Sequence, residues 1–424
     1  MDEKTKTKIL KLMELTDGKI CNHCLGRKFS DVIEGNGNFE RGKKIREELK
    51  LNNLEEDDEC DICKNLFKYL DETILKKVEA KVKYLNLEYE TFVVGSKLEP
   101  MITEKDEYLN KRLDLDVEPI KKEVNRTIGK LLEKNLNKEV DFNAQDIVIM
   151  IDLKNVFNKE SKVLKDGTLD NIKVRIQINP IFIEGRYNKY IRGIPQTKWP
   201  CRNCKGKGCE KCNGTGKQYP ESVEELLSET VLKESKGYEA KFHGAGREDI
   251  DVRMLGTGRP FVLEIKEPKI RNLDLKKIER EVNILNNNKT KYNDLKFVKR
   301  NRKAVIKVSS PDSYKVYRAL VKCDEKINKN DLEKLNKLHI IEQRTPIRVA
   351  HRRADKIRIK EVKNIKTNYI DFHSFEMIIK TQGGLYIKEL ISGDEGRSQP
   401  NISELLNNKS ICEELDVIEV GMEK

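Results

Sequence analysis

Four Cys-x-x-Cys pairs restrict the possible folds of this chain more than any other feature of its sequence. They contain eight of its ten cysteines: Cys21 and Cys24, Cys60 and Cys63, Cys201 and Cys204, and Cys209 and Cys212. The N-terminus, Met1-Asp2-Glu3-Lys4, lacks the apolar segment of a signal peptide, so we expect a cytoplasmic protein. A reducing cytosol disfavours disulfides, and metal binding is therefore the preferred interpretation of the pairs.

The first two pairs predict a structural zinc site. Cys21, Cys24, Cys60 and Cys63 offer four thiolates, which can close a tetrahedral site and leave no coordination position open for chemistry. The alternatives are buried cysteines without a metal, or a redox pair. With zinc, residues 1–70 form a small metal-stabilised module, because so short and charged a segment buries too little apolar surface to fold alone.

The other two pairs form a repeat within a Cys- and Gly-rich linker of residues 191–218. Residues 201–208 and 209–216 both follow Cys-x-x-Cys-x-Gly-x-Gly, which is similar to the zinc-binding repeats of a co-chaperone family. Four residues between the pairs is tight for one site. Zinc at these cysteines is therefore a candidate second site, formed by Cys201, Cys204, Cys209 and Cys212. The remaining cysteines, Cys323 and Cys412, are expected to be small buried hydrophobic residues.

Length and charge indicate a multidomain protein that binds a polyanion. The 424 residues correspond to about three domains, and no run approaches the roughly 18 apolar residues of a membrane helix. The 84 Lys and Arg exceed the 72 Asp and Glu, for a net charge of +12. Residues 266–303 hold 13 basic against 5 acidic side chains, and residues 344–360 form a second basic patch. Such patches favour RNA or DNA, although a Lys- and Glu-rich surface like that of thermophiles is the alternative.

The middle of the chain predicts alternating helices and strands. We expect a helix over residues 117–136 and buried strands over 147–153 and 172–183, within a domain of residues 71–190. In residues 186–199 cations alternate with aromatic rings, which suits phosphate contact and base stacking; the alternative is a linker whose aromatics cap a neighbouring core. A helix is expected to begin near Ser222 and to open the last domain, residues 219–424.

The segment Gly246 to Arg253 places a carboxylate on a short loop. Strands are expected before it, at residues 238–242, and after it, at residues 260–266, with Gly244, Gly246, Gly256 and Gly258 making sharp turns between them. Such a loop is a suitable place for a catalytic acid. On this segment alone, a solvated acidic turn is an equal alternative.

Three motifs in order resemble the catalytic motifs of RNA pseudouridine synthases: Arg247-x-Asp249, Lys315-x-Tyr317 and Tyr386-Ile387-Lys388. The strings at residues 179–187, 246–253, 343–355 and 386–397 extend the likeness over the whole chain. It resembles the archaeal and eukaryotic tRNA pseudouridine synthases that have an N-terminal THUMP-containing module and modify uridines 54 and 55 of the T-loop.

This resemblance implies an α+β fold. The catalytic domain would have a mixed, mostly antiparallel sheet with flanking helices, and it would follow an N-terminal zinc and THUMP-type RNA-binding module. Residues 71–190, with an apolar strand that ends in Asp152-Leu153, are similar to a THUMP domain in their order of strands and helices.

The resemblance also implies residue roles. Asp249 would be the essential carboxylate, paired with Lys388, and would either attack the sugar or remove a sugar proton. Tyr317 would contact the base and help to remove the C5 proton, and Tyr386 would pack against the flipped nucleotide. The other expected substrate contacts are an anion anchor, Arg247, and two apolar walls, Ile387 and Leu415.

Several of these positions have rivals in the sequence. Asp251 competes with Asp249, and would face the same side of an extended chain but lie farther from Arg247. Tyr314 competes with Tyr317. His243 is expected to be structural, because the reaction needs no imidazole.

The implied substrate is tRNA, with the target uridine extruded into the pocket and the basic side chains holding the backbone. The expected backbone contacts are Arg186, Lys189, Arg192, Arg344, Arg348, Arg352 and Arg353. Zinc would be structural. The isomerisation oxidises and transfers nothing, so no organic cofactor is expected, nor is a membrane or an obligatory protein partner.

Two other classes of protein are alternatives to a pseudouridine synthase. A THUMP-containing methyltransferase or thiolase would need a glycine-rich cofactor loop or a phosphate-binding loop, and the sequence has neither. A non-catalytic zinc-containing tRNA-binding or chaperone-like protein would explain the cysteines and the charge. It would leave the ordered Asp, Tyr and Lys motifs unexplained.

Overall fold

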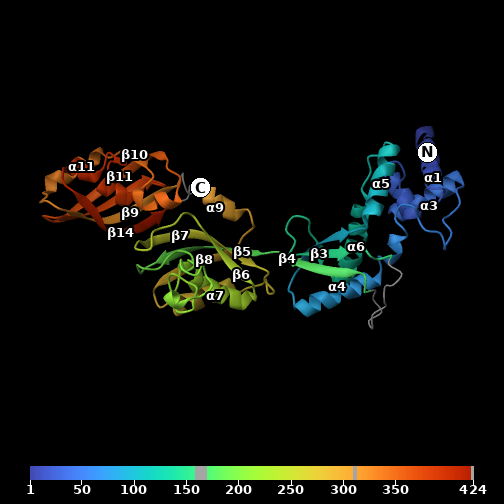
Figure 1. The fold of residues 1–424 in the computed structure, drawn as a ribbon, viewed down its shortest axis with the longest axis horizontal. Coiled ribbons are helices and arrows are strands. Elements are labelled where there is room, and N and C mark those ends of the chain that lie inside the picture. The colour runs from blue at the N-terminus through green and yellow to red at the C-terminus, as the bar shows by residue number, and fades with distance from the viewer. Residues whose placement is uncertain (158–169, 309–312, 422–424) are drawn as a thin grey trace. The chain divides into compact units, whose positions relative to one another are not determined.

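The computed structural model describes residues 1–157, 170–308 and 313–421, in two compact units (Figure 1). Unit 1 is Met1–Asn179 with Lys269–Arg271, and unit 2 is Pro180–Pro268 with Asn272–Lys424. Both units combine helices with a β-sheet, which confirms the expected α+β class.

Unit 1 begins with short helices around a cysteine cluster. These are α1 (Glu3–Leu15), α2 (Asn22–Lys28), α3 (Asn38–Leu49) and the 3-10 helix η1 (Leu66–Tyr69). Glycines let α2 and α3 touch backbone to backbone. A Cβ on Gly26 would lie 1.8 Å from the carbonyl oxygen of Asn38, and one on Gly42 would lie 2.1 Å from that of Asn22. Larger residues at these two positions would force the helices apart.

The rest of unit 1 is a four-stranded sheet in the order β2-β1-β3-β4, with β1 parallel to β2 and β3, and β4 antiparallel to β3. Its elements are α4 (Glu72–Leu85), β1 (Thr91–Lys97), α5 (Pro100–Arg112), α6 (Ile120–Leu136), β2 (Glu139–Val140), β3 (Ile147–Asp152) and β4 (Lys173–Ile178). The predicted helix over 117–136 and strand over 147–153 are therefore present as α6 and β3. Proline at position 119 is the N-cap of α6, so the helix begins three residues later than predicted.

Unit 2 is built on a ten-stranded sheet in the order β13-β10-β11-β12-β9-β14-β7-β5-β8, with β6 paired to β7. Its strands are β5 (Ile181–Lys189), β6 (Glu239–Gly244), β7 (Arg253–Lys266), β8 (Thr290–Phe297), β9 (Tyr314–Cys323), β10 (Ile340–Arg344), β11 (Ile357–Asp371), β12 (Ser374–Gln382), β13 (Ser398–Gln399) and β14 (Ser410–Val420). Among these strands β14 and β7 pair in parallel and the other neighbours are antiparallel. The expected mixed, mostly antiparallel sheet is confirmed.

Helices and a Cys-rich loop connect these strands. The helices are η2 (Glu210–Cys212), α7 (Val223–Ser235), α8 (Leu275–Leu285), α9 (Arg302–Val308), η3 (Lys329–Lys337), η4 (Ile347–Arg352), α10 (Ile387–Ser392) and α11 (Ile402–Leu406). The predicted start of α7 is confirmed, because the side chain of Ser222 accepts a hydrogen bond from the backbone N–H of Glu225.

Two local predictions differ from the structure. The expected strand over 172–183 is broken at Asn179 and Pro180, where the proline lacks a backbone donor, and its two parts belong to different units. Gly256 and Gly258, which were expected in turns between strands, have φ of +56° and +72° inside β7. A Cβ on Gly256 would lie 2.0 Å from the carbonyl oxygen of Ile418, so β7 needs glycine there to pass β14.

The strand β5 also changes the expected boundary at residue 190. It pairs with β7 along one edge and with β8 along the other, so residues 181–189 are an interior strand of unit 2. The N-terminal segment of unit 1 ends at Asn179.

Candidate active site and metal centres

The loop between β6 and β7 lines a cavity of about 210 Å³ in unit 2. Its lining residues are Pro195, Gln196, Trp199, Arg247, Glu248, Asp249, Ile250, Asp251, Arg348 and Lys388. Of the predicted site residues, the structure therefore brings Asp249, Arg247 and Lys388 together, and it adds Arg348.

Asp249 and Asp251 are paired with different cations. Arg348 Nη1 lies 2.8 Å from Asp249 Oδ2, whereas Lys388 Nζ lies 4.0 Å from Asp249 Oδ2 and 2.5 Å from Asp251 Oδ2. Lys388 is thus within ion-pair distance of Asp249, its expected partner, although its nearest carboxylate is that of Asp251. The two carboxylates lie on a turn, in which the N–H of Val252 donates to the carbonyl of Asp249, so the chain between them is not extended.

The two carboxylates also differ in exposure. The side chain of Asp249 is 32% exposed and that of Asp251 is 65% exposed. Burial on its own would raise the pKa of Asp251, but the ammonium of Lys388 outweighs this effect and holds it below the usual value. Both carboxylates line the cavity, and Asp249 is the one whose Oδ2 lies 2.8 Å from the guanidinium of Arg348.

Arg348 was expected to contact the RNA backbone, and in the structure it belongs to the site. Its Nε forms an ion pair with Glu389, whose side chain is 5% exposed, and its guanidinium lies 5.9 Å from the ring centroid of Tyr386. Sequence reasoning missed Glu389, because its partner Arg348 is 41 positions away and no local pattern marks the contact. Glu389 and Asp249 hold the guanidinium between them.

Buried side chains fix the loop that carries Asp249. The carboxylate of Glu248, which precedes it, accepts hydrogen bonds from the Tyr187 hydroxyl at 2.8 Å and from Arg259 Nε at 2.8 Å. Gln196 Nε2 donates to the Tyr187 hydroxyl and to the carbonyl of Gly246. These side chains are buried, which makes their hydrogen bonds costly to break, so the loop is held in one conformation.

Lys189, a predicted RNA contact, supports the same loop from within the protein. Its side chain is fully buried, and its ammonium donates to the carbonyls of Ile194, Asp249 and Ile250 at 3.0 to 3.2 Å. An ammonium has only three donors, and all three are used within the protein.

Arg186 and Arg192 are also engaged within the protein. Arg186 Nε donates to the carbonyl of Thr257 at 2.6 Å, and its Nη2 donates to that of Gly258. Arg192 Nη1 donates to the carbonyl of Asp251 at 2.6 Å, and its Nη2 forms an ion pair with Asp416 at 2.9 Å. Both cations therefore contact neighbouring parts of the sheet, on β7 and β14, and their predicted contact with RNA stays a prediction.

The remaining predicted RNA contacts lie on the segment after β10. Arg344 forms an ion pair with Asp355 at 2.6 Å, and both side chains are about half exposed. Arg353 is exposed, and Arg352 ends η4, although the description does not extend to its side chain. These positions stay predicted RNA contacts.

Tyr317 lies on β9 on the same side as Lys315 and outside the cavity lining. Burial raises the pKa of Tyr317 to about 12, so the phenol is neutral at physiological pH. The rival Tyr314 is engaged elsewhere, since its hydroxyl donates to Glu419 at 2.6 Å and Lys380 lies 3.8 Å from its ring centroid.

Three other predicted contacts also lie outside the cavity lining. Tyr386 caps α10, and its backbone N–H and carbonyl both bond the side-chain amide of Gln343. Ile387 and Leu415 are buried, with 3% and 7% exposure. His243 also lies outside the cavity lining: its Nε2 is 2.8 Å from Glu264 Oε2, and its Nδ1 is 3.2 Å from Lys307 Nζ.

The four cysteines of unit 1 have the geometry of a metal site. Their sulfurs lie within 4.8 Å of one another, and Cys21 Sγ is 3.5 Å from Cys63 Sγ. Tetrahedral zinc with Zn–S bonds of about 2.3 Å requires sulfurs about 3.8 Å apart. The guanidinium of the buried Arg27 lies 3.8 Å from Cys24 Sγ, where it would offset part of the negative charge of a four-thiolate site. Cys21, Cys24, Cys60 and Cys63 therefore fit zinc.

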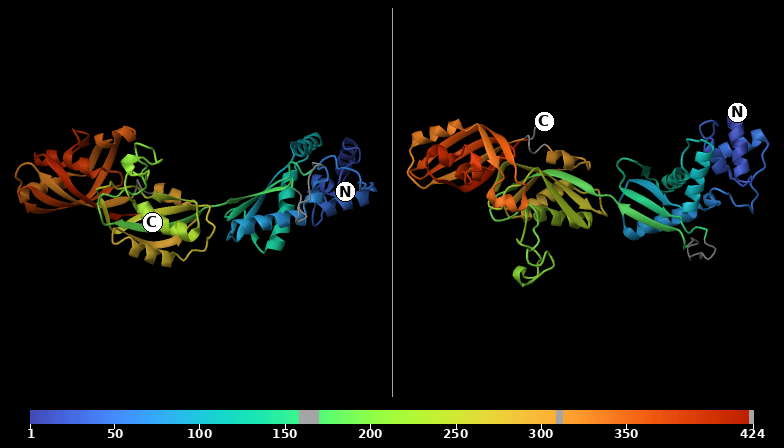
Figure 2. Two further views of the ribbon diagram at one scale, coloured as in Figure 1. Left: turned by 60° about the horizontal axis from the view of Figure 1, so that its bottom comes forward. Right: turned by 45° about the horizontal axis from the view of Figure 1, so that its top comes forward.

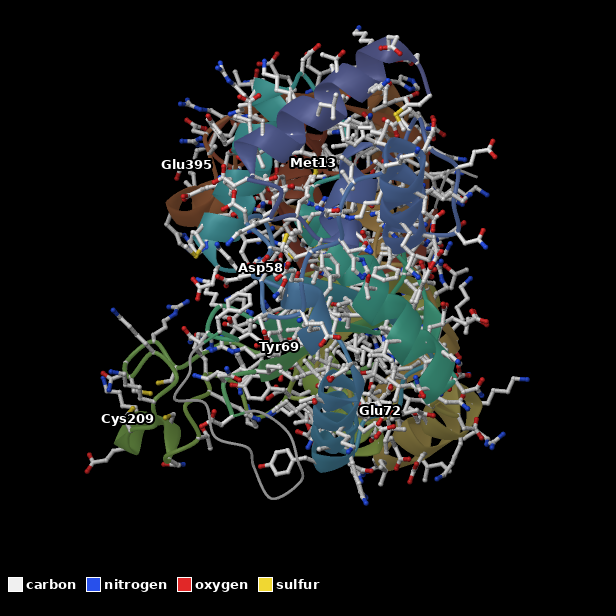
Figure 3. The ribbon with its side chains drawn as sticks, turned by 90° about the vertical axis from the view of Figure 1, so that its right-hand side faces the viewer. Met13, Asp58, Tyr69, Glu72, Cys209 and Glu395 are labelled. Carbon is white, nitrogen blue, oxygen red and sulfur yellow. The ribbon has the colours of Figure 1, made fainter. Side chains whose placement is uncertain are left out.

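The second cluster fits equally well. The Sγ atoms are 3.9 Å apart for Cys201 and Cys209, 3.8 Å for Cys204 and Cys212, and 3.7 Å for Cys209 and Cys212. The backbone N–H groups of Gly208 and Gly216 point at two of these sulfurs, from 3.2 Å. Both glycines have positive φ, which folds the short connection back and lets one site use both pairs. In Figure 3 sulfur atoms gather beside the labelled Cys209.

Comparisons with known proteins agree with this architecture. The model of the Pus10 C-terminal family matches residues 182–421, and that of the archaeal Pus10 THUMP domain matches residues 74–152. This chain belongs to the Pus10 family. The C-terminal match begins within β5, in agreement with a second unit that starts at Pro180, and the THUMP match runs from α4 to the end of β3.

Curated members of the Pus10 family resemble the chain over nearly its full length. The tRNA pseudouridine synthase Pus10 of Methanothermobacter marburgensis is 51% identical over 97% of both chains. Those of Methanosphaera stadtmanae and Methanocaldococcus jannaschii are 43% and 46% identical, over 95% of this chain and 95% and 92% of their own lengths. Among the helices in the described residues, none is long and apolar enough to cross a membrane.

Proposed function

We propose that this chain is a tRNA pseudouridine synthase in which Asp249 is the catalytic carboxylate. The observation that carries the proposal is the carboxylate of Asp249 in a cavity, 2.8 Å from the guanidinium of Arg348, on a loop fixed by buried side chains. The curated Pus10 relatives, which match more than nine-tenths of the chain, are named tRNA pseudouridine synthases. The target would be uridine 54, uridine 55 or both, in the T-loop.

The reaction breaks the N1–C1′ bond of uridine, turns the uracil, and joins C5 to C1′. Asp249 either attacks the sugar or removes a sugar proton, and both routes need an ionised carboxylate. Arg348 at 2.8 Å and Lys388 at 4.0 Å place two positive charges beside this carboxylate. Nothing is oxidised or transferred to another molecule, so the protein's own side chains suffice for the chemistry.

Tyr317 would act on the base as a neutral phenol. Because its pKa is raised to about 12, the phenol keeps its proton at neutral pH and can donate a hydrogen bond. To accept the proton from C5 of the base, it would first have to lose its own. Arg259, whose charge lowers the pKa of Tyr317 against the larger effect of burial, is the group that would favour this loss.

The uridine must leave the stack of the T-loop to reach Asp249, because the carboxylate lies inside a cavity. The exposed cations after β10, such as Arg353, and those of residues 266–303 would contact the phosphate backbone. Zinc bound to the two Cys clusters would hold the local fold together, and all four protein ligands at each cluster would be used for this purpose.

The test is an activity assay on defined RNA. An unmodified tRNA transcript is incubated with the protein, and pseudouridine is mapped by chemical adduct formation and primer extension. We expect stops at position 54, position 55 or both, and each stop should vanish in a transcript with cytidine at that position. A transcript that binds the protein but gains no pseudouridine in the T-loop would contradict the proposal.

A further inference from the structure

The Cys-rich loop of unit 2 is a stem-closed finger that projects from the sheet (Figure 2). At its base Pro200 pairs with Lys217, and the N–H of Gln218 donates to the carbonyl of Trp199 at 2.9 Å. Above this stem, residues 201–216 wrap around the four sulfurs. We define residues 200–217 as the finger.

The stem of the finger reaches the Asp249 cavity. Trp199 lines the cavity, and the guanidinium of Arg247 lies 5.8 Å from the centroid of a Trp199 ring. The ring of Tyr219, just after the stem, packs edge-on against Trp199 at 5.7 Å. One wall of the cavity is thus an aromatic and guanidinium surface that continues directly into the finger.

The charge of the finger has one sign. It contains five basic residues and one acidic residue, Glu210. Lys217, at the base, forms an ion pair with Glu225 at 2.6 Å. The other four cations are exposed and, among the residues that the structure describes, form no ion pair: Arg202, Lys205, Lys207 and Lys211. These side chains are therefore available to an external anion.

We propose that the finger is an RNA-binding element, whose four exposed cations contact the phosphates of the strand that enters the Asp249 cavity. The proposal rests on the proposed function, since it takes RNA as the occupant of that cavity. A flexible tail loses conformational entropy when it binds RNA, and this loss offsets part of the free energy of its phosphate contacts. A loop already ordered by a metal loses less, so its phosphate contacts contribute more to affinity. Trp199 and Arg247 would then offer a stacking surface to the nucleotide next to the target.

The experiment compares two variants of the full chain with equal change in charge. The test variant changes Arg202, Lys205, Lys207 and Lys211 to Gln, and leaves every cysteine in place. The control variant changes four exposed lysines of α7, its C-cap and η3 to Gln: Lys233, Lys236, Lys329 and Lys337. Zinc content is measured in all three proteins and should be equal, which shows that the finger is still folded.

Dissociation constants for an unmodified tRNA transcript are then measured across a series of salt concentrations. The test variant should bind at least roughly tenfold more weakly near 0.1 M salt, and its log–log salt slope should be smaller by about two to three. The control variant should stay near the parent. A test variant that matches the control in affinity and slope would overturn the proposal.

Chemical labelling of lysines in the parent protein gives a second readout that needs no variant. Bound tRNA should protect Lys205, Lys207 and Lys211 from acetylation and leave Lys233 and Lys236 reactive. Equal labelling of the finger with and without tRNA would also overturn the proposal. Pseudouridine formation by the parent is scored separately, so a parent that binds through the finger but forms no pseudouridine would contradict only the proposed function.

Discussion

Arg348 bridges two carboxylates of different character at the residue scale. Glu389 is almost fully buried, and Asp249 is about one third exposed in the cavity. A guanidinium has a planar fork of donors and can face both groups at once, whereas the ammonium of lysine is a compact point charge. Glu389 therefore fixes the direction from which Arg348 meets Asp249.

Replacement of Arg348 by Lys should slow catalysis without a matching loss of tRNA affinity. Hydrogen bonds to charged groups contribute about 1.5–3 kcal/mol, so we expect a rate at saturating tRNA that is lower by roughly tenfold to a hundredfold. Single-turnover rates and dissociation constants measure the two effects. Arg318→Lys is the matched control, because Arg318 pairs with Asp416 outside the cavity lining. Equal rates for the two variants would show that Arg348 has no role in catalysis.

Lys315 should make the protein less stable at neutral pH than in alkali. Burial lowers the pKa of its ammonium from 10.5 to about 7, and the charge of Arg259 adds to this effect. Between these values the unfolded chain binds more protons than the folded chain, so the free energy of unfolding rises with pH.

In Lys315→Met this part of the pH dependence should disappear. The variant should gain on the order of 4 kcal/mol below pH 7, as measured by chemical denaturation from pH 6.5 to 9.5. Lys322→Met is the control, because that lysine lies on the same strand but is exposed. A Lys315→Met variant with the parent's pH dependence would show that this ammonium is solvated.

The sequence was enough to predict residues that lie in recognisable motifs, but not residues that act through partners far away in the chain. The order of the motifs was enough to predict Asp249, Arg247 and Lys388, and all three line one cavity. Glu389 and Arg259 act through contacts with residues about 40 and 11 positions away, across different elements, and no local pattern marks them. Lys189 looked like an RNA contact because sequence shows its charge but not its burial.

At the scale of elements, each metal cluster should behave as a local fold. Cys21→Ser combined with Cys60→Ser should lower the zinc content by one per chain and make residues 1–70 sensitive to protease. The reason is that the free energy of zinc binding stabilises the folded segment, and the double variant loses it. Elemental analysis and limited proteolysis measure this. Cys323→Ser, at a buried cysteine outside both clusters, should keep the parent's zinc content. Unchanged zinc in the double variant would exclude this site.

Elements with a strong local signal were predicted well. The helices α6 and α7 and the strand β3 follow from apolar periodicity and from capping residues such as Ser222. The break at Pro180 was missed because the apolar run continues on both sides of it. Gly256 was predicted in a turn because glycine favours turns, but here glycine is required by the close passage of Ile418 inside the sheet.

At the scale of the whole molecule, the boundary between the units determines which truncations fold. Removal of residues 1–179 should leave a unit 2 that unfolds cooperatively, since β5 keeps both of its partners, β7 and β8. Removal of residues 1–190 deletes this interior strand and should give an unfolded or aggregated chain. Circular dichroism during thermal unfolding compares the two. Equal folding of both truncations would contradict the place of β5 in the sheet.

The role of Asp249 as the catalytic carboxylate is tested most directly by comparing Asp249→Asn with Asp251→Asn in the pseudouridine assay. Asparagine keeps the shape of the side chain but can act neither as a nucleophile nor as a base. Asp249→Asn should abolish pseudouridine formation and keep tRNA affinity within about threefold of the parent, and Asp251→Asn should retain activity. Pseudouridine formed by Asp249→Asn at the parent's rate, or activity lost only in Asp251→Asn, would show that Asp249 is not the catalytic carboxylate.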